Sequence, residues 1–274
     1  MNKTNKQAFD WIQDNFPFEN YIPEARMSSY FEMPDAIFKY VGTDAKILDF
    51  GAGPCDKTAM LSLRGFDVTA YDDFGDSWYK KDGNKDKILE FANNSGINYK
   101  MPDKDGNFDF EEKSFDVLIL NNIIEHLHNS PRDFINELLK FLKPGGYLIV
   151  DVPNAANFRK RIDLLLGRTN YPSFSSYYWS PNPWRGHNRE YVKNDLVQLN
   201  DFLKLNMMEV SDHHYHLDKL SKFATIIFKL ICKIIPGVRE SWIYVGQKPE
   251  GWRANLIPSQ KELEDANKKN YFKG

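Results

Sequence analysis

AKILDFGAGPC at residues 45–55 predicts the architecture of this chain, together with Tyr71-Asp72-Asp73 further along. A short apolar segment runs into a glycine turn, a helical segment follows, and a second apolar segment ends in acidic residues. This order predicts a βαβ unit that binds a nucleoside, because glycines let the backbone approach the ligand and the later carboxylate accepts ribose hydroxyls. Asp72 follows Gly51 by about 20 residues, which is the spacing that such a unit requires.

Position 56 separates this turn from a dinucleotide site. A G-x-G-x-x-G fingerprint would have its third glycine there, whereas this chain has Asp56. A carboxylate at that helix N-terminus would repel a pyrophosphate, which binds to free N–H groups. Asp56 therefore favours a nucleoside ligand without phosphates, and we predict S-adenosylmethionine.

Several segments occur in the order found in class I S-adenosylmethionine-dependent methyltransferases. Asp49-Phe50-Gly51-Ala52-Gly53 resembles the first motif of that family, with Cys55 in place of its third glycine. The other similar segments are residues 114–127, 142–150, 152–154 and 186–191. The resemblance covers residues 28–250 and implies a small-molecule methyltransferase.

The predicted fold is α/β, with a Rossmann-like, doubly wound, mostly parallel sheet of seven strands and helices on both faces. Continuous apolar stretches such as residues 117–120 are typical of parallel strands buried on both sides. Strands are expected at residues 46–50, 67–71, 97–101, 115–120, 147–152, 208–212 and 242–246. Helices are expected at residues 35–40, 56–64, 76–94, 131–142, 193–203 and 218–235.

Three regions are predicted along the chain. Residues 1–44 form an aromatic, helical lead-in, residues 45–250 form the methyltransferase domain, and residues 251–274 form a C-terminal tail. Within the domain, residues 154–190 follow the fifth strand as a lid, rich in aromatic and basic side chains and broken by prolines. Ligands bind at this carboxyl side of open α/β sheets, and long aromatic loops in compact domains are usually functional.

Composition limits the classes of partner. The chain has 274 residues, 42% of them hydrophobic, and a net charge of −2, which gives no general attraction to nucleic acid. Its two cysteines, Cys55 and Cys232, are too few for a disulfide framework and indicate a reducing, cytoplasmic setting. Neither a signal peptide nor a membrane span is expected. The expected partner is a small-molecule methyl acceptor, and the oligomeric state stays open.

The ribose anchor is predicted at Asp72, because it ends the second strand at the cofactor crevice. Asp73 could take its place if the register slips by one residue, and a helix-capping role for Asp72 is the structural alternative. The resemblance implies that Asn121 offers its carbonyl to the cofactor's ammonium. The full predicted cofactor set is Asp49, Gly51, Ala52, Gly53, Asp72, Asp73, Asp105, Gly106, Asn107, Asn121 and Asn122.

Four residues are candidates for the chemistry: Glu125, His126, His187 and Arg189. The methyl group of S-adenosylmethionine is already electrophilic, so the enzyme mainly aligns an acceptor and removes its proton, for which histidine suits neutral pH. His126 could instead be a packed residue that begins a helix. Residues 187–190 could merely cap a helix that begins near Tyr191, with Arg189 paired to an acid rather than to an acceptor anion.

No metal is predicted. Ubiquinone-pathway O-methyltransferases carry E-x-x-E-H after the fourth strand, whereas this chain has Asn122-Ile123-Ile124-Glu125-His126, and a neutral amide weakens a hard-cation site. The run His213-His214-Tyr215-His216 would place histidines on both faces of a strand, which prevents convergence on one ion.

Residues 218–235 predict a basic amphipathic helix. Leu220, Phe223, Ile227, Leu230 and Ile234 recur at helical spacing, and lysines lie off that face. Such a helix can lie on a membrane, but packing across the sheet explains the same pattern, and we expect packing.

The leading functional hypothesis is methylation of an oxygen on an anionic or sugar- or nucleotide-linked metabolite, such as a cell-surface polysaccharide precursor. Aromatic faces stack on sugars or bases, and arginines bind phosphate or carboxylate. The alternatives are methylation of a lipid-like quinone or phenol at a membrane, and a catalytically silent protein that binds S-adenosylmethionine.

Overall fold

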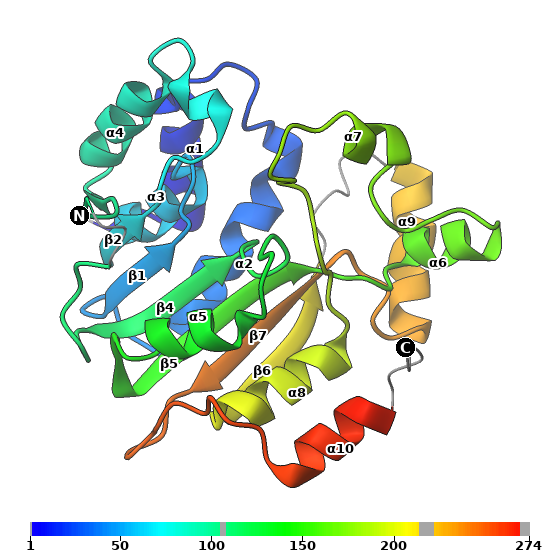
Figure 1. The fold of residues 1–274 in the computed structure, drawn as a ribbon. Coiled ribbons are helices and arrows are strands. Elements are labelled where there is room, and N and C mark those ends of the chain that lie inside the picture. The colour runs from blue at the N-terminus through cyan, green and yellow to red at the C-terminus, as the bar shows by residue number, and fades with distance from the viewer. Residues whose placement is uncertain (1, 105–107, 214–221, 269–274) are drawn as a thin grey trace.

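The computed structural model describes residues 2–104, 108–213 and 222–268 (Figure 1). Its strands form one sheet in the order β3-β2-β1-β4-β5-β7-β6. They are β1 Lys46–Phe50, β2 Asp67–Tyr71, β3 Asn98–Lys100, β4 Phe115–Asn121, β5 Leu142–Pro153, β6 Asn206–His213 and β7 Ser241–Gln247. Within these described residues, β7 pairs antiparallel with β5 and β6, and the other strand pairs are parallel. The predicted seven-stranded, mostly parallel sheet is therefore confirmed.

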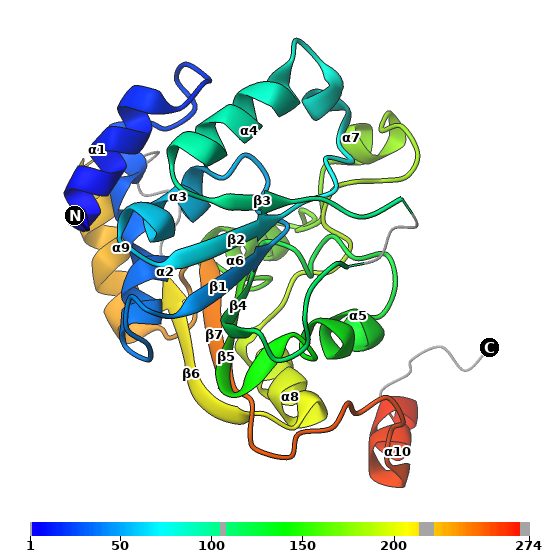
Figure 2. The same ribbon diagram turned by 90° about the vertical axis from the view of Figure 1, so that its left-hand side faces the viewer.

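Helices cover both faces of the sheet, as Figure 2 shows. They are α1 Asn5–Asn15, α2 Met27–Phe38, α3 Asp56–Leu63, α4 Asn84–Asn94, α5 Pro131–Leu138, α6 Phe158–Leu165, α7 Phe174–Tyr178, α8 Lys193–Leu203, α9 Lys222–Ile234 and α10 Gln260–Lys268. Buried side chains of α1 to α4 belong to the apolar clusters on one face, and those of α5 and α8 to the cluster on the other.

The apolar sequence of β4 explains why helices must cover both faces of the sheet. Val117 and Ile119 belong to the cluster under α2, whereas Leu118 and Leu120 belong to the cluster under α5 and α8. All four side chains are almost completely buried. A parallel strand at the centre of a doubly wound sheet requires this composition, because successive side chains point to opposite faces.

Local sequence signals set two of the helix ends. Gly65 follows α3 with a φ of 101° and donates its N–H to Ser62 O at 2.9 Å, a left-handed ending that glycine adopts without strain. Ser130 caps α5 by accepting the N–H of Arg132, and Pro131 occupies the first turn.

Other boundaries differ from the predictions. The helix expected at residues 76–94 is divided into a 3₁₀ turn, Ser77–Lys80, and α4, because Asp82 and Gly83 between them are both left-handed. The helix expected at residues 131–142 ends at Leu138, because Leu142 already pairs with Phe115 in the sheet. The helix expected at residues 35–40 begins at Met27 and ends at Phe38.

Two regions contain helices that the sequence did not predict. The lid, expected to be irregular because of its prolines, contains α6 and α7, each capped by an N-terminal polar side chain, Asn157 or Ser173. The C-terminal tail contains α10. His214, His216 and the first residues of the helix predicted at 218–235 lie outside the described residues. No described helix is long and apolar enough to cross a membrane.

Candidate active site

The glycine turn after β1 has the left-handed backbone that its sequence requires. Gly51 and Gly53 have φ values of 75° and 55°. A Cβ atom on Gly51 would lie 2.1 Å from the Cδ1 atom of Ile123, so another residue there would require both a shifted Ile123 side chain and a strained left-handed backbone. Cys55, which stands where the family has its third glycine, also has a positive φ of 62°. The departure from the family motif therefore keeps the glycine-like backbone, at a cost on the order of 1 kcal/mol for a residue with a Cβ.

The side chain of Asp72 links the end of β2 to this turn by a hydrogen bond. Its Oδ2 atom accepts the N–H of Gly53 at 2.9 Å, and its Oδ1 atom accepts the N–H of Phe74 at 2.8 Å. Burial raises the pKa of Asp72, and these two hydrogen bonds oppose that rise. The carboxylate caps no described helix, so the capping alternative is wrong. Asp73 is exposed and accepts the N–H of Gly75, away from the turn.

Asp49 lies inside the fold at the end of β1. Its Oδ2 atom accepts the hydroxyl of Thr58 at 2.6 Å, while its Oδ1 atom is buried and has no hydrogen-bond partner among the described residues. Burial raises the pKa of Asp49 to about 6. The backbone N–H groups of Gly51 and Ala52 both donate to Tyr71 O, so these two groups brace the turn.

The remaining predicted cofactor residues lie in two places. Asn121 ends β4, and its side-chain oxygen accepts from the side-chain nitrogen of Asn122 at 3.1 Å. Asn122 is left-handed, with a φ of 55°, and donates its backbone N–H to Asp151 O. Both therefore lie at the carboxyl end of the sheet beside the turn. Asp105, Gly106 and Asn107 lie outside the described residues.

Glu125 is a buried carboxyl whose Oε1 atom lies 4.0 Å from Nε2 of His126. Its side chain is completely buried, and neither of its carboxyl oxygens has a hydrogen-bond partner among the described residues. Burial raises the pKa of Glu125 to about 8, and the negative charge of Asp151 adds to the rise. At neutral pH this group therefore holds its proton most of the time.

His126 and His187 face each other, although 60 positions separate them in the sequence. Their ring centroids are 4.9 Å apart with an angle of 81° between the planes. The Nδ1 atom of His126 lies 2.9 Å from the carbonyl oxygen of Arg185, and Nδ1 of His187 lies 2.9 Å from Oε1 of Glu190. Because an oxygen acceptor faces each Nδ1, we assign the proton to that atom, which leaves both Nε2 atoms as bases. His126 begins no described helix, so that alternative is wrong.

Lys160 completes the surroundings of His187. This lysine is buried on α6, and its ammonium contacts the second carboxyl oxygen of Glu190. Burial lowers the pKa of Lys160 to about 8. Burial also lowers the pKa of His187 to about 4, with the positive charges of His126 and Lys160 as further causes. Since Lys160 already neutralises Glu190, His187 is a neutral imidazole at pH 7.

Three cavities share His187 as a lining residue, and the two larger ones give an acceptor room. One, of about 440 Å³, is lined by Asn122, Pro153, Lys160 and Glu190 among others. The second, of about 350 Å³, is lined by the aromatic lid residues Tyr171, Phe174, Tyr177 and Trp184. An acceptor molecule therefore has room beside His187, with charged groups on one side and aromatic rings on the other.

The Arg189 side chain is largely exposed to solvent, although it also lines a third cavity, of about 260 Å³, with His187 and Glu190. Its guanidinium is mostly exposed and lies 3.5 Å from a carboxylate oxygen of Asp195, near the start of α8. This contact agrees with the alternative in which Arg189 pairs with an acid. The backbone of this segment braces the site, since the N–H groups of Asn188 and Arg189 both donate to Glu125 O. Residues 187–190 do not cap a helix, because α8 begins at Lys193 and Asp195 accepts the N–H of Val192.

One group of described side chains could hold a metal ion. One ligand atom each from Glu125, His126 and His187 lies within 4.8 Å of the others. A carboxylate with two imidazoles suits zinc or another transition ion better than a hard cation. When bound, such an ion would polarise an acceptor hydroxyl. His213 is engaged elsewhere, between Glu32 and Asp151.

Lys160 and Glu190 were not predicted as site residues. Lys160 is the middle residue of Arg159-Lys160-Arg161, and nothing in the sequence distinguishes its buried position from its neighbours. Glu190 belongs to the segment 186–191, and the resemblance of that segment to the family is the sequence feature that could have identified Glu190 as a site residue.

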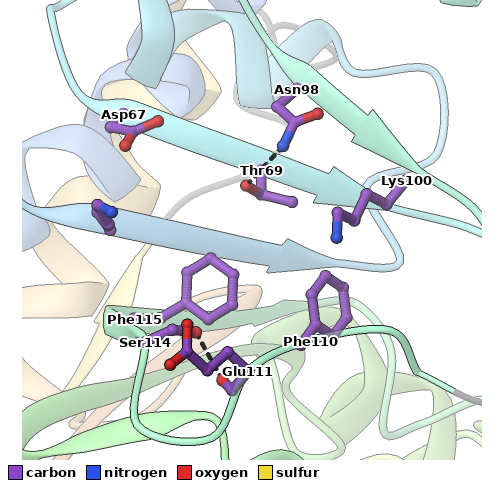
Figure 3. A pocket seen from close by; sticks show the side chains of 9 residues that line it. Asp67, Thr69, Asn98, Lys100, Phe110, Glu111, Ser114 and Phe115 are labelled. Atoms are coloured by element: carbon purple, nitrogen blue, oxygen red, sulfur yellow. Dashed lines mark hydrogen bonds between the residues drawn. The ribbon is translucent and has the colours of Figure 1, made fainter.

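Another pocket, of about 240 Å³, lies away from these residues (Figure 3). Lys46, Asp67 and Phe115, which line it, are the first residues of β1, β2 and β4. The pocket therefore opens toward the amino ends of these strands, whereas the predicted site lies at their carboxyl ends. It is no part of the candidate active site.

Comparisons with known proteins agree with this architecture. Residues 24–204 match the profile of a family described as a methyltransferase domain. The ubiquinone biosynthesis O-methyltransferase of Rickettsia bellii is 33% identical over 138 residues, 49% of each chain. That of Rickettsia prowazekii is 34% identical over 157 residues, 56% of this chain and 58% of the relative. The match thus spans about half the length of these curated relatives.

Solved structures share the fold at low sequence identity. A methyltransferase of Methanosarcina mazei described as dependent on S-adenosylmethionine has a TM-score of 0.52 at 16% identity, covering 78% of this chain and 97% of that one. A protein of Pyrococcus horikoshii has a TM-score of 0.53 at 17% identity, covering 85% and 93%.

The chain belongs to the methyltransferase-domain family, and its fold is that of the class I S-adenosylmethionine-dependent methyltransferases. The predicted family, fold class and cofactor are confirmed at this level.

Proposed function

We propose that this protein transfers the methyl group of S-adenosylmethionine to a hydroxyl oxygen of a small aromatic acceptor, with His187 as the base. The observation that carries the proposal is the fixed, neutral imidazole of His187 in the lining of the two larger cavities. When bound, S-adenosylmethionine supplies a methyl group that is already electrophilic, so acceptor alignment and proton removal are the tasks left to the protein.

The glycine turn would hold the nucleoside. The Asp72 carboxylate is fixed by the N–H groups of Gly53 and Phe74, so its remaining lone pairs have a set direction toward ribose hydroxyls. Gly51 shapes the turn through its left-handed φ of 75°, and the side chain of Ile123 occupies the space that a Cβ would need. Asp49 and Asn121 lie at the adjoining strand ends, where the methionine part would lie.

Proton removal falls to Nε2 of His187. Its Nδ1–H donates to Glu190, so the ring cannot rotate freely and presents its basic nitrogen to the acceptor side. As the acceptor hydroxyl loses its proton to Nε2, the Glu190 carboxylate keeps Nδ1–H in place. A phenolic hydroxyl suits this base, because its acidity exceeds that of a sugar hydroxyl.

The aromatic lining supports an aromatic acceptor. Tyr171, Phe174, Tyr177 and Trp184 offer ring faces for stacking around the cavity that His187 closes. The curated relatives carry the name ubiquinone biosynthesis O-methyltransferase, which favours a phenol or quinone precursor among the sequence-based hypotheses. The polysaccharide-precursor hypothesis has no support from the relatives, and Lys160, the cation beside His187, is already paired with Glu190.

A methyl-transfer assay with a panel of soluble acceptors tests this proposal. We expect label from methyl-labelled S-adenosylmethionine to appear on a catechol, and not on a nucleotide sugar offered under the same conditions. The matched control is the acceptor with both hydroxyls already methylated. Binding of S-adenosylhomocysteine without transfer to any hydroxyl acceptor would support the silent binding protein instead.

A further inference from the structure

The apolar face of α9 does not pack across the sheet as predicted. Ile227, Leu230 and Ile234, three of the residues that define that face, are exposed, and Ile234 is 79% exposed. Ile226 beside them is exposed as well. The packing explanation is therefore wrong for this part of the helix, and these side chains need another account.

The lid presents similar side chains to solvent. Leu164, Leu165 and Leu166 end α6, and Leu165 is 85% exposed. On and after α7, Phe174, Tyr178 and Trp179 are exposed, with Trp179 at 78%. Such a concentration of large apolar side chains on one part of a surface marks an interaction site rather than ordinary scatter.

The three helices lie on the same side of the molecule. Figure 1 shows α6, α7 and α9 beyond the carboxyl ends of the parallel strands, with α6 beside α9. Phe158 of α6 contacts Phe228 of α9, with ring centroids 5.7 Å apart. We call the exposed apolar side chains of these helices, together with Leu166 and Trp179, the docking face.

Basic residues accompany the docking face, although the chain as a whole has a net charge of −2. Residues 154–186 contain five basic residues and one acid, and α9 contains three lysines and no acid. Arg159, Arg168 and Lys233 are exposed among the apolar side chains. The negative charge of the chain is thus concentrated elsewhere, and this side is locally positive.

We propose that the docking face binds the surface of a bilayer that contains anionic phospholipid. Exposed leucines and isoleucines can enter the acyl boundary, tryptophan and tyrosine favour the headgroup level, and arginine and lysine bind lipid phosphates. Helices that lie in the interface plane combine such an apolar face with basic flanks, and the sequence of α9 has this pattern.

The position of the docking face also bears on substrate entry. Phe174 belongs to it and also lines the aromatic cavity beside His187. An apolar acceptor dissolved in the bilayer would therefore meet the cavity from the membrane side. This step rests on the proposed function, whereas bilayer binding by itself does not.

Vesicle cosedimentation tests the proposal on the full chain. We expect binding to vesicles of phosphatidylcholine mixed with phosphatidylglycerol, weaker binding to phosphatidylcholine alone, and weaker binding as salt rises. The double variant Leu165→Ser/Ile234→Ser should lower partitioning to the mixed vesicles by roughly 10-fold or more, because two apolar anchors are lost. The matched control is Leu256→Ser/Ile257→Ser, which removes the same residue types at exposed positions outside the docking face.

Three outcomes would overturn the proposal: no binding of the wild-type protein, equal loss in the control variant, or concentration-dependent self-association that only Leu165→Ser/Ile234→Ser abolishes. The last would make the docking face a contact between copies of the chain. Methyl transfer to a soluble catechol by the docking-face variant is measured alongside. We expect it to be unchanged, so a failure of bilayer binding and a failure of the proposed reaction are distinguished.

Discussion

The Nδ1 atom of His187 lies 2.9 Å from Oε1 of Glu190, and the other oxygen of that carboxylate contacts the buried ammonium of Lys160. A histidine beside an unpaired carboxylate would hold its proton at neutral pH. Here the carboxylate is neutralised, burial opposes the imidazolium, and the pKa of His187 is lowered to about 4. The three residues together therefore maintain a neutral, oriented imidazole in the lining of the two larger cavities.

This arrangement predicts an unusual pH profile. Because His187 is neutral above about pH 4, the acid limb of kcat/KM should lie well below the value of 6.5 that an ordinary histidine would give. Lys160→Met removes a positive charge that lowers the pKa of His187, so the acid limb should move to higher pH. The measurement is kcat/KM against pH for both proteins, with Arg168→Met, an exposed basic residue of the same lid, as the control. An acid limb that does not move in Lys160→Met would contradict the assigned charge arrangement.

Asp72 gives a prediction about the cofactor. Asp72→Ala should weaken the binding of S-adenosylhomocysteine by about 1–3 kcal/mol, the scale of losing a hydrogen bond to a charged group. Asp73→Ala should leave the affinity nearly unchanged, because that carboxylate bonds to Gly75 outside the turn. Titration calorimetry on both folded variants checks the difference. Equal effects of the two substitutions would remove Asp72 as the specific ribose anchor.

Glu125 gives a prediction about stability. Burial raises its pKa to about 8 in the folded protein, so the folded state binds this proton more tightly than the unfolded state does. Its contribution to stability is present below the unfolded pKa, about 4.5, and is lost as pH rises through about 8. The free energy of unfolding of the wild type should therefore fall across this window by roughly 2–5 kcal/mol more than that of Glu125→Gln. Denaturant titrations at several pH values measure the two slopes, and parallel slopes would show that the carboxyl is ionised throughout.

The sequence predicts those parts of the site whose residues lie close together along the chain. The glycine turn, Asp72 and the strand ends come from one βαβ unit, whose local order is diagnostic, and the structure has them at adjoining positions. Lys160, Glu190 and His126 come from separate segments. Their contacts depend on how the lid folds back over β4 and β5, which no local pattern specifies.

The same reasoning explains why two predictions about the helices are wrong. Asp82 and Gly83 adopt left-handed conformations that helical periodicity does not reveal, so one long helix was predicted instead of two shorter elements. The apolar side of α9 has the spacing of a packed helix, and only the three-dimensional structure shows that no part of the described sheet covers Leu230 and Ile234. Periodicity predicts that a face is apolar, and it does not say what that face contacts.

Metal dependence gives a further prediction. We propose that methyl transfer needs no metal, because the neutral amide of Asn122 replaces the first acid of the E-x-x-E-H motif. Turnover should therefore persist after dialysis against a chelator. Loss of turnover that zinc or magnesium restores would contradict this and would assign the ligands to Glu125, His126 and His187. Thermal stabilisation by each ion, measured on the chelated protein, gives a readout that does not depend on activity.

The most direct test of the account is the turnover of His187→Ala with methyl-labelled S-adenosylmethionine and a catechol. We predict that kcat falls by a factor on the order of 10²–10⁴ while the affinity for S-adenosylhomocysteine stays within about twofold, because His187 acts on the acceptor and not on the cofactor. His128→Ala, which changes an exposed histidine nearby in the sequence, should retain wild-type turnover. Methyl transfer at the wild-type rate by folded His187→Ala would contradict the central claim and make His126 the next residue to test.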